Sequence, residues 1–548
     1  MSASDKKKLR KEEAVAKLTE RQAAEQNEAK KLKLYTTIFA VVVGAMLIFA
    51  LVFGISKTVS NSGVIERNTI AATVGDHEIT SAEMNMFYID AINTFYNQYG
   101  SYAYMFGLDT TIPLNEQIVD PETGATWADD FMDSAKDNLK YVYAMCDLAN
   151  AEGYTITEEE QKQLDDALLN AEFYALYNYG YTDLETYLKA MYGAGCTEEL
   201  FTKYQHNAAL AQSYYNNYVA SLTYEDADLR EFEKDILSQY SAYTYNSYTL
   251  NVNDFLTGGT TDEEGNTTYS DEEKAAAVAA AEEAAKALTA EEIVTVEDLD
   301  AAIAALEINA EKENVASIVY TDHAYDSISS TIREWVTDES RKEGDLTYIP
   351  STTTSTDADG NETTTTNSFI VVIYHGTNDN KFPLANVRHI LVSFEGGTQD
   401  ENGVTTYSED EKKAAEAKAA DLLAQLETKG ATAENFAELA AANSTDPGSK
   451  DNGGLYTDVY PGQMVQAFND WCFAEDRKVG DTGLVETDYG WHVMYYDGDS
   501  ETTYRDFLIT NDMKEADTTA WYDAEMEKVT VEILDDSHIQ KDLVLSNG

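Results

Sequence analysis

The sequence contains only three cysteines, Cys146, Cys196 and Cys472, among its 548 residues. So few, and an odd number, exclude a disulfide framework as the main source of stability. Cys472 lies in an apolar helical pattern, which predicts a small buried side chain. No Cys/His spacing suits zinc, and the acidic loops DEEGN and DENGV lack the full calcium-loop pattern. We therefore expect no metal and no other cofactor.

Basic residues are scarce as well. The chain has 38 Lys and Arg against 99 Asp and Glu, a formal net charge of −61. Such a charge excludes nucleic acid as a natural partner and keeps the chain soluble. Its 37 tyrosines are too many for a disordered acidic tail. The composition therefore predicts a folded protein with a solvated acidic surface.

Charged residues are absent from one long stretch, residues 34–56, which is long enough to span a bilayer core as a helix. Residues 1–33 carry ten Lys and Arg against six Asp and Glu. This bias predicts a cytoplasmic head at 1–33 and places the rest of the chain outside the membrane. A cleaved signal peptide is the alternative, although the head is long for one and no clear A-x-A site follows. We expect an uncleaved, single-pass anchor in the cell membrane.

The densest group of motifs lies between two histidines near the C-terminus, within residues 385–498. The apolar run VRHILV and the alternating run GLVETDYGWHVMYY predict strands that each carry one histidine. Between them, ENFAELAAAN and GQMVQAFNDWCF have the apolar spacing of amphipathic helices. Strands, helices and a Gly-rich turn predict one small unit of common domain size.

This segment resembles the parvulin family of peptidyl-prolyl cis-trans isomerases. The motifs HIL, F-x-x-L-A, S-x-D-x-x-S, GG, G-x-M-x-x-x-F, R-K-x-G-D and G-x-H occur in the family's order. One departure is that the family's usual GGDLG reads GGLYT at 453–457, so its acidic residue is missing. The stretch SFEGGTQDENG after the first strand has no Lys or Arg, so the phosphopeptide specificity of some members is not expected. The resemblance implies an enzyme for X-Pro bonds that needs neither metal nor cofactor.

The resemblance also implies which residues form the site. The implied catalytic residues are His389, Asp446, His492 and Ser444, and the implied substrate-binding residues are Leu391, Met464, Phe468, Gln463 and Tyr489. The two histidines would lie side by side on adjacent strands and hold a hydrogen-bond network. Met464 and Phe468, one helical turn apart, would form the floor for the proline ring. Two alternatives stay open. Met464 and Phe468 could simply be residues of the hydrophobic core, and the histidines could only set the geometry of the sheet.

Two segments of the chain also resemble each other in sequence. NSYTLNVNDF at 246–255 parallels VRHILVSF, and YTDHAYDSISSTIREW at 320–335 lies over YTDVYPGQMVQAFNDW without a gap. Residues 242–378 are therefore predicted to form a second, degenerate parvulin-like domain, unless the likeness reflects Ala/Glu-rich composition. The expected counterparts of His389, His492, Met464 and Phe468 are Tyr248, Ile370, Ile328 and Ile332. These changes would remove the polar network, which favours an inactive scaffold or a substrate-binding domain.

The remaining segments are predicted to be mostly helical. After a strand and a Gly-Asp turn, Thr80 with Glu83 predicts a capping box that opens a helix. This pattern in residues 66–224 resembles the N-terminal chaperone region of foldases of the SurA and PrsA type. Its many tyrosines could contact unfolded clients or only fill helix interfaces. Residues 499–548 predict a helix and a strand that pack back on this region.

The expected fold class is thus α+β: a single transmembrane helix, a helical chaperone-like module and two parvulin-like domains, each a small antiparallel sheet flanked by helices. The leading hypothesis is an extracytoplasmic, membrane-anchored foldase that isomerises X-Pro bonds in unfolded or partly folded secreted proteins. The competing hypothesis is a non-catalytic chaperone or envelope scaffold that uses the parvulin folds to bind peptide. A homodimer is left open.

Overall fold

The computed structural model describes residues 63–545, apart from 263–264, 357–359 and 401–402. The predicted anchor at 34–56 lies outside the described residues, and no helix within them is long and apolar enough to cross a membrane. The described chain divides into two compact units, one formed by residues up to Thr223 together with those from Lys514 on, the other by Tyr224–Met513. Each unit combines helices with antiparallel sheet.

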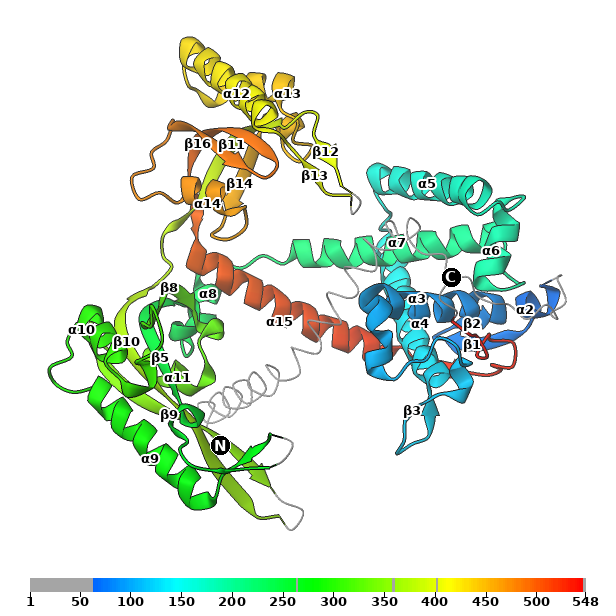
Figure 1. Ribbon diagram of the computed structural model, residues 1–548. Helices are drawn as coiled ribbons and strands as arrows, with labels where there is room; N and C mark the ends of the chain where they lie inside the picture. Colours follow the sequence, from blue (N-terminus) through cyan, green and yellow to red (C-terminus); the bar gives the residue numbers. More distant parts are fainter. Residues whose placement is uncertain (1–62, 263–264, 357–359, 401–402, 546–548) are drawn as a thin grey trace, which may run out of the picture. The chain divides into compact units, whose positions relative to one another are not determined.

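The first unit is mainly helical (Figure 1). Its elements are α2 (Val64–Asn68), β1 (Ile70–Val74), β2 (His77–Thr80), α3 (Ser81–Tyr99), η1 (Gly100–Phe106), η2 (Leu114–Glu116), β3 (Ile118–Asp120), β4 (Ala125–Thr126), α4 (Trp127–Glu152), α5 (Glu158–Phe173), the π-helical turn η3 (Tyr174–Asn178), α6 (Leu184–Tyr192), α7 (Glu198–Ser221), the end of α15 and β17 (Val531–Ile533). β17 pairs with β1, so the C-terminal segment completes a sheet begun by the first described strand. The core centres on α3, whose Met84, Phe87 and Tyr88 are almost fully buried.

The start of α3 follows the predicted cap only in part. The Thr80 side chain accepts a hydrogen bond from the backbone N–H of Glu83, as expected for an N-cap. The reciprocal bond of a capping box is not formed, because the Glu83 carboxylate points into the unit. There it accepts hydrogen bonds from Tyr143 Oη at 2.5 Å and Lys203 Nζ at 3.0 Å. The side chain that should close the cap instead ties α3 to α4 and α7.

The second unit contains two four-stranded sheets. Its elements are α8 (Asp226–Glu233), η4 (Leu237–Tyr240), β5 (Ala242–Asn251), η5 (Val252–Phe255), β6 (Thr260–Thr261), β7 (Thr267–Thr268), α9 (Asp271–Leu288), α10 (Val296–Ala304), η6 (Glu307–Asn309), β8 (Ile318–Ala324), η7 (Tyr325–Ser327), α11 (Ser330–Val336), β9 (Leu346–Thr356), β10 (Glu362–Asn378), β11 (Pro383–Ser393), β12 (Thr398–Gln399), β13 (Thr405–Thr406), α12 (Glu409–Lys429), α13 (Ala433–Asn443), η8 (Lys450–Asn452), β14 (Leu455–Val459), α14 (Gln466–Cys472), β15 (Thr482–Thr487), β16 (Gly490–Thr503) and α15 (Tyr504–Lys528). The strand orders are β8-β5-β10-β9 and β14-β11-β16-β15, so the sheets share one connectivity.

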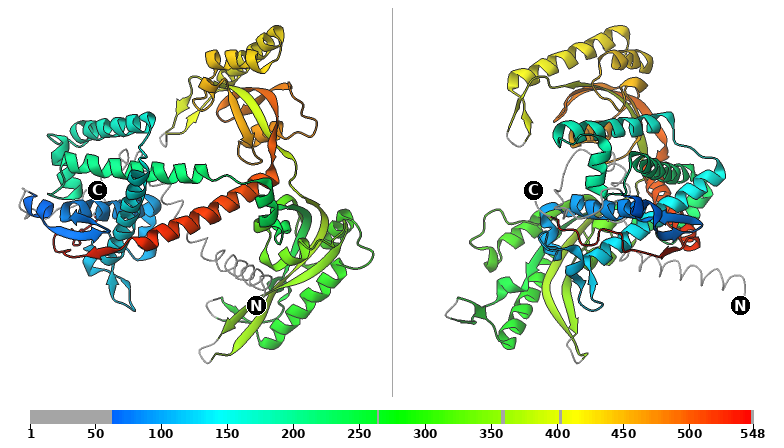
Figure 2. Two further views of the ribbon diagram at one scale, coloured as in Figure 1. Left: turned by 180° about the vertical axis from the view of Figure 1, so that it is seen from behind. Right: turned by 90° about the vertical axis from the view of Figure 1, so that its right-hand side faces the viewer.

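Each sheet buries both of its faces, because successive side chains of a strand point to opposite sides. In the first sheet, Val371 and Ile373 pack with α9 and α10, whereas Val372 and Tyr374 pack with α11. The second sheet repeats this arrangement, with α12 and α13 on one face and α14 on the other. Figure 2 shows the helices on the two faces of each sheet. The helices therefore leave the central strands with little contact with solvent.

Local details also recur between the two sheets. Asp322 and Asp458, each the last residue of a YTD sequence in an edge strand, both have positive φ, 45° and 54°. Arg341 lies over the ring of Trp335 at 4.8 Å, as Arg477 lies over Trp471 at 3.9 Å. An ion pair between Arg388 and Asp497 links β11 to β16. At the equivalent positions of the first sheet, a hydrogen bond between Asn246 and His375 links β5 to β10.

The register of the strands corrects one expected counterpart. Tyr374 and Tyr496 are equivalent, since the backbone N–H of each donates to the carbonyl of Asp345 or Asp481 in the matching turn. Counting back from them, Ser247 faces Val372 as His389 faces Met494. Ser247, not Tyr248, therefore stands at the position of His389, and Ile370 stands at that of His492.

Tyr248 lies on the opposite face of the sheet from the one expected. It packs with the α9–α10 core, and its hydroxyl oxygen accepts a hydrogen bond from Asn309 Nδ2 at 2.8 Å. A shift of one residue in a strand turns every side chain to the other face. The likeness between the apolar letters of the two segments could not exclude that shift.

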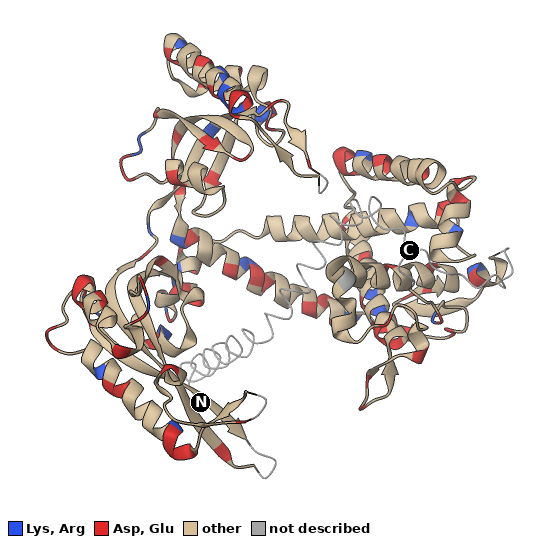
Figure 3. Ribbon diagram, viewed as in Figure 1, with Lys and Arg blue, Asp and Glu red and all other residues tan. Residues whose placement is uncertain are grey.

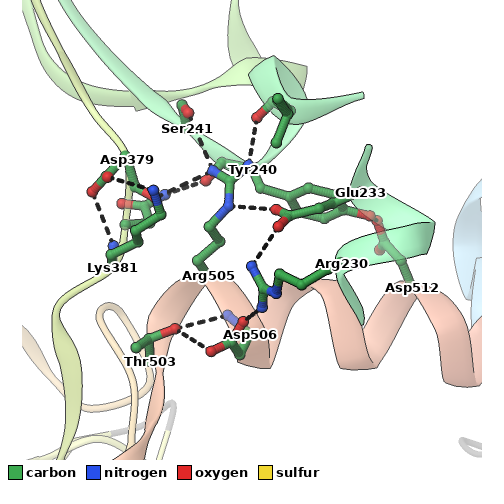
Figure 4. A network of polar contacts seen from close by, with 12 residues as sticks. Arg230, Glu233, Tyr240, Ser241, Asp379, Lys381, Thr503, Arg505, Asp506 and Asp512 are labelled. Atoms are coloured by element: carbon green, nitrogen blue, oxygen red, sulfur yellow. Dashed lines mark hydrogen bonds and ion pairs between the residues drawn. The ribbon is translucent and has the colours of Figure 1, made fainter. Parts of the chain in front are cut away.

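A buried polar cluster gathers around Arg505 at the start of α15 (Figure 4). The guanidinium is 3% exposed and donates to Glu233 Oε2 at 2.6 Å, Leu237 O at 3.0 Å and Asp379 O at 3.2 Å. The backbone N–H of Arg505 donates to Asn380 O at 2.7 Å. The cluster thus joins α8 and η4, the β10–β11 connection and the start of α15.

Candidate active site

Two neighbouring strands place His389 and His492 side by side. In the antiparallel pair β11–β16, His389 faces Met494 and His492 faces Leu391, so the histidines are diagonal neighbours on one face. Their rings lie 5.2 Å apart at 21°, with a distance of 2.9 Å between the two Nδ1 atoms. Both side chains are buried, at 4% and 5% exposure.

The loop after α13 brings a carboxylate to the outer side of His389. Ser444 fixes the loop, because its Oγ accepts hydrogen bonds from the backbone N–H of Leu391 and of Asp446, each at 3.2 Å. Asp446 Oδ2 then lies 3.0 Å from His389 Nε2. Ser449 Oγ at 2.5 Å and Tyr456 Oη at 3.1 Å donate to the same oxygen.

These contacts form one chain of hydrogen bonds that satisfies every ring nitrogen with both histidines neutral. Thr487 Oγ1 lies 2.8 Å from His492 Nε2 and can donate its proton there. His492 then donates from Nδ1 to Nδ1 of His389, and His389 donates from Nε2 to Asp446. The only charged group in this chain of hydrogen bonds is the Asp446 carboxylate at its end.

Burial and neighbouring groups favour this protonation state. Burial lowers the pKa of His389, against the opposing effect of Asp446. Burial, with the adjacent His389, lowers the pKa of His492 to about 4. Burial alone would raise the pKa of Asp446, but hydrogen bonds from Ser449 and His389 hold it at about 2. At neutral pH the two rings are therefore neutral and the carboxylate is ionised.

The Gly-Gly turn before β14 lets the backbone approach His389 closely. Gly454 has φ +76°, and a Cβ there would lie 2.3 Å from the carbonyl oxygen of His389. The backbone N–H of His389 donates to the carbonyl of Gly454 at 2.9 Å. The missing acidic residue of this motif is Leu455 here, and the next residue, Tyr456, reaches Asp446.

An aromatic ring closes the apolar side of the histidines. The ring of Phe468 stands edge-on to His389 at 5.4 Å and 78° and to His492 at 5.5 Å and 88°. Phe468 is only 3% exposed, whereas Met464 is partly buried and packs on the same cluster. The expectation that both share a helix face is wrong, because α14 begins at Gln466 and Met464 lies in the preceding turn.

The other three expected binding residues lie at different distances from this cluster. Leu391 faces His492 across the strands and is partly buried. The Gln463 side chain accepts a hydrogen bond from the backbone N–H of Tyr460 at 3.1 Å and so closes its own turn. Tyr489 is 65% exposed in the β15–β16 turn, where its backbone N–H donates to Thr487 Oγ1. Among the described residues, the side chains of Gln463 and Tyr489 make no hydrogen bond or ring contact with either histidine.

Three residues of the hydrogen-bonded chain were not among the expected site residues. Ser449 ends the S-x-D-x-x-S motif, so its position could have been found from the sequence. Tyr456 lies just after the Gly-Gly turn, at a position where the family motif indicates no such role. Thr487 lies five residues before His492, at the end of the preceding strand, and only the pairing of β15 with β16 shows that it reaches the ring.

The sequence of this region matches a known family. The family profile described as PPIC-type PPIASE domain matches residues 371–497. The chain contains a parvulin-type domain. We call the sheet β14-β11-β16-β15 with its helices the PPIase domain. Within the described residues, no group of three or more His, Cys, Asp or Glu side chains could hold a metal ion.

Curated relatives are foldases. "Foldase protein PrsA 2" of Listeria monocytogenes is 38% identical over 73 residues, which is 13% of this chain and 25% of the relative. "Foldase protein PrsA" of a Geobacillus species is 42% identical over 71 residues, again 13% and 25%. The chain therefore spans about a quarter of the length of these relatives. The solved peptidylprolyl isomerase PrsA of Bacillus cereus is similar at 24% identity, over 27% of this chain and 50% of that one, with a TM-score of 0.17.

Proposed function

We propose that the PPIase domain catalyses cis-trans isomerisation of X-Pro peptide bonds in unfolded or partly folded secreted proteins. The observation that carries the proposal is the hydrogen-bonded chain from Thr487 through His492 and His389 to Asp446, with Phe468 edge-on to both rings. The match to the PPIC-type PPIASE profile and the foldase names of the relatives support it.

The chemistry asks for no nucleophile. An X-Pro bond isomerises slowly because the amide must lose its conjugation, at a cost of about 20 kcal/mol. Catalysis then needs an apolar contact for the proline ring and fixed dipoles that favour the twisted amide over both planar forms. In our proposal, Phe468 and Met464 supply the contact. The neutral histidines and the Asp446 carboxylate supply the dipoles without exchanging protons with the substrate.

We further propose roles for the other segments. Residues 242–378 form a degenerate parvulin-like domain, a role supported by the shared connectivity of the two sheets and by Ser247 and Ile370 at the histidine positions. Residues 66–224, on which the tail at 499–548 packs with its part from Lys514 on, bind unfolded clients. A single helix at 34–56 anchors the protein, with its bulk on the extracytoplasmic side of the membrane. The apolar stretch and its basic flank in the sequence support the anchor.

A substitution of Thr487 tests the catalytic proposal. Thr487→Val keeps the side-chain volume but removes the hydrogen-bond donor to His492 Nε2. Without this donor, nothing favours the tautomer of His492 that carries its proton on Nδ1, nor the matching tautomer of His389. We expect kcat/KM of the full chain on a short X-Pro peptide to fall by about tenfold, the worth of one such hydrogen bond. Thr487→Ser retains the hydroxyl and should stay within about twofold of wild type. A wild-type rate no higher than the uncatalysed rate would end the proposal.

One observation favours a non-catalytic scaffold as the second candidate. The first sheet has the same strand order without any of the hydrogen-bonded residues of the PPIase domain, so the architecture does not depend on them. This candidate predicts that His389→Ala combined with Met464→Ala leaves client secretion unchanged, while deletion of residues 66–224 abolishes it. Loss of secretion in the first variant and not in the second would reject it.

A further inference from the structure

A row of large apolar side chains on α5 and η3 faces solvent. Leu169, Phe173 and Tyr177 follow each other at four-residue spacing and are 64%, 52% and 75% exposed. The rings of Phe173 and Tyr177 lie 4.9 Å apart at 33°. Residues four apart in a helix share one face. We call these three side chains, with Tyr179 (38% exposed), the α5 stripe.

The stripe is not the core-facing side of the helix. Leu164, Ala167 and Ala171 of α5 and Ala175 of η3 are at most 8% exposed and form the inner face. Small alanines let α5 lie close to its neighbours, so the large residues on the outer face are not needed to fill that contact. Single exposed apolar residues are ordinary, but a contiguous group marks an interaction surface.

The backbone at the end of α5 helps to group these rings. η3 is a π-helical turn, in which the N–H of Tyr179 donates to the carbonyl of Tyr174 at 3.1 Å. Such single π-turns often accompany functional sites. Beyond the turn, the ring of Tyr179, the last member of the stripe, stacks on Tyr187 at 5.7 Å and 10°.

The charged residues of α5 and of the segment that follows it are almost all negative. Between residues 158 and 185 the only basic side chain is Lys162. The acidic residues in this span are Glu158, Glu159, Glu160, Asp165, Asp166, Glu172, Asp183 and Glu185. In Figure 3 the ribbon at the start of α5 carries the colour of Asp and Glu, which belongs to Glu158, Glu159 and Glu160 in its first turn. A partner that lays an apolar segment on the stripe is favoured when Lys or Arg flank that segment, and opposed when Asp or Glu do.

We propose that the α5 stripe binds extended segments of unfolded protein in which aromatic or aliphatic residues alternate with Lys or Arg. The apolar side chains of the segment lie on Phe173 and Tyr177, and its cations meet the acidic residues beside them. Faces of the aromatic rings add attraction for the same cations. This inference rests on the proposed foldase function and names the class of client segment that the first unit selects.

Peptide binding to the full chain tests the proposal. Two fluorescent peptides share the same apolar residues, one with Lys and the other with Glu between them, and fluorescence anisotropy gives their affinities. We expect the Lys peptide to bind at least about tenfold more tightly than the Glu peptide and to lose affinity as salt is added. The double variant Phe173→Ala with Tyr177→Ala should weaken binding of the Lys peptide by about tenfold or more.

The matched control removes two other exposed aromatic side chains of the first unit. Tyr102 and Tyr104 on η1 are 64% and 69% exposed. The variant Tyr102→Ala with Tyr104→Ala should bind the Lys peptide within about twofold of wild type. Binding by the stripe variant equal to wild type, an equal loss in the control, or equal affinity for both peptides would each overturn the inference. Turnover of a short X-Pro peptide by wild type, measured alongside, shows separately whether the proposed isomerase function fails.

Discussion

At the scale of single residues, the two buried histidines make the PPIase domain sensitive to acid. The folded protein lowers the pKa of His492 from 6.5 to about 4, chiefly by burial, whereas the unfolded chain takes up the proton near pH 6.5. Between these values the unfolded state binds more protons, so stability is lost as the pH falls through this window and is fully present above it. A shift of this size corresponds to roughly 3 kcal/mol.

Urea unfolding at a series of pH values measures this loss. Wild type should lose stability between pH 6.5 and 4 relative to His492→Gln, whose side chain does not titrate. Asp446, whose pKa is lowered from 3.8 to about 2, should add a further loss only below about pH 4. A constant difference between wild type and His492→Gln over the upper window would show that His492 titrates normally in the folded state.

Much of the site was predictable because its residues lie in short motifs. His389 and His492 fall on strands that the apolar pattern already indicated, and Asp446 and Ser444 belong to one loop motif. The role of Thr487 was not predictable, because a hydrogen bond across a strand pairing leaves no mark in local sequence. Nor could spacing alone show that the Gln463 side chain closes its own turn.

At the scale of elements, the Gly-Gly turn sets the distance between β14 and β11. Gly454→Ala would place a Cβ 2.3 Å from the carbonyl oxygen of His389 at φ +76°, so backbone must move. We expect the free energy of unfolding to fall by about 3 kcal/mol or more, with loss of isomerase activity. Gly462→Ala is the matched control, because its φ is +82° and nothing lies within 4 Å of its Cβ. It should cost only about 1 kcal/mol. Equal losses in urea unfolding would contradict the steric argument.

The elements themselves were predicted better than their registers and ends. The runs VRHILV and ENFAELAAAN lie within β11 and α13 as the periodicity indicated. The helix expected to include Met464 starts two residues later, since GQMV forms the turn before it. The Tyr248 error had the same origin. Polar and aromatic residues lie on both faces of β5, so a shift of one residue leaves its pattern almost unchanged.

At the scale of the whole second unit, the chain enters the PPIase domain and leaves it at neighbouring points, both next to the Arg505 cluster. Pro383 at the start of β11 pairs with Thr503 at the end of β16. Immediately outside this pair, the backbone N–H of Tyr504 donates to Phe382 O and that of Arg505 to Asn380 O. The guanidinium then holds Glu233 and the carbonyls of Leu237 and Asp379. The PPIase domain has its own cores on both faces of its sheet, so the cluster fastens its ends and does not build its site.

Replacement of Arg505 separates these two roles. Arg505→Met leaves the Glu233 carboxylate buried beside Arg230 alone and deprives two carbonyls of their donor, which should cost about 3 to 5 kcal/mol locally. Because the domain's own cores are untouched, we expect kcat/KM on a short X-Pro peptide to stay within about twofold of wild type. Hydrogen exchange at the amides of Tyr504 and Arg505 should rise strongly, while the amide of His389, bonded to Gly454, stays protected. Lys381→Met, a neighbouring exposed cation, is the matched control and should change neither. Loss of isomerase activity in Arg505→Met, or exchange that rises equally at His389, would mean that the cluster and the PPIase domain unfold as one unit.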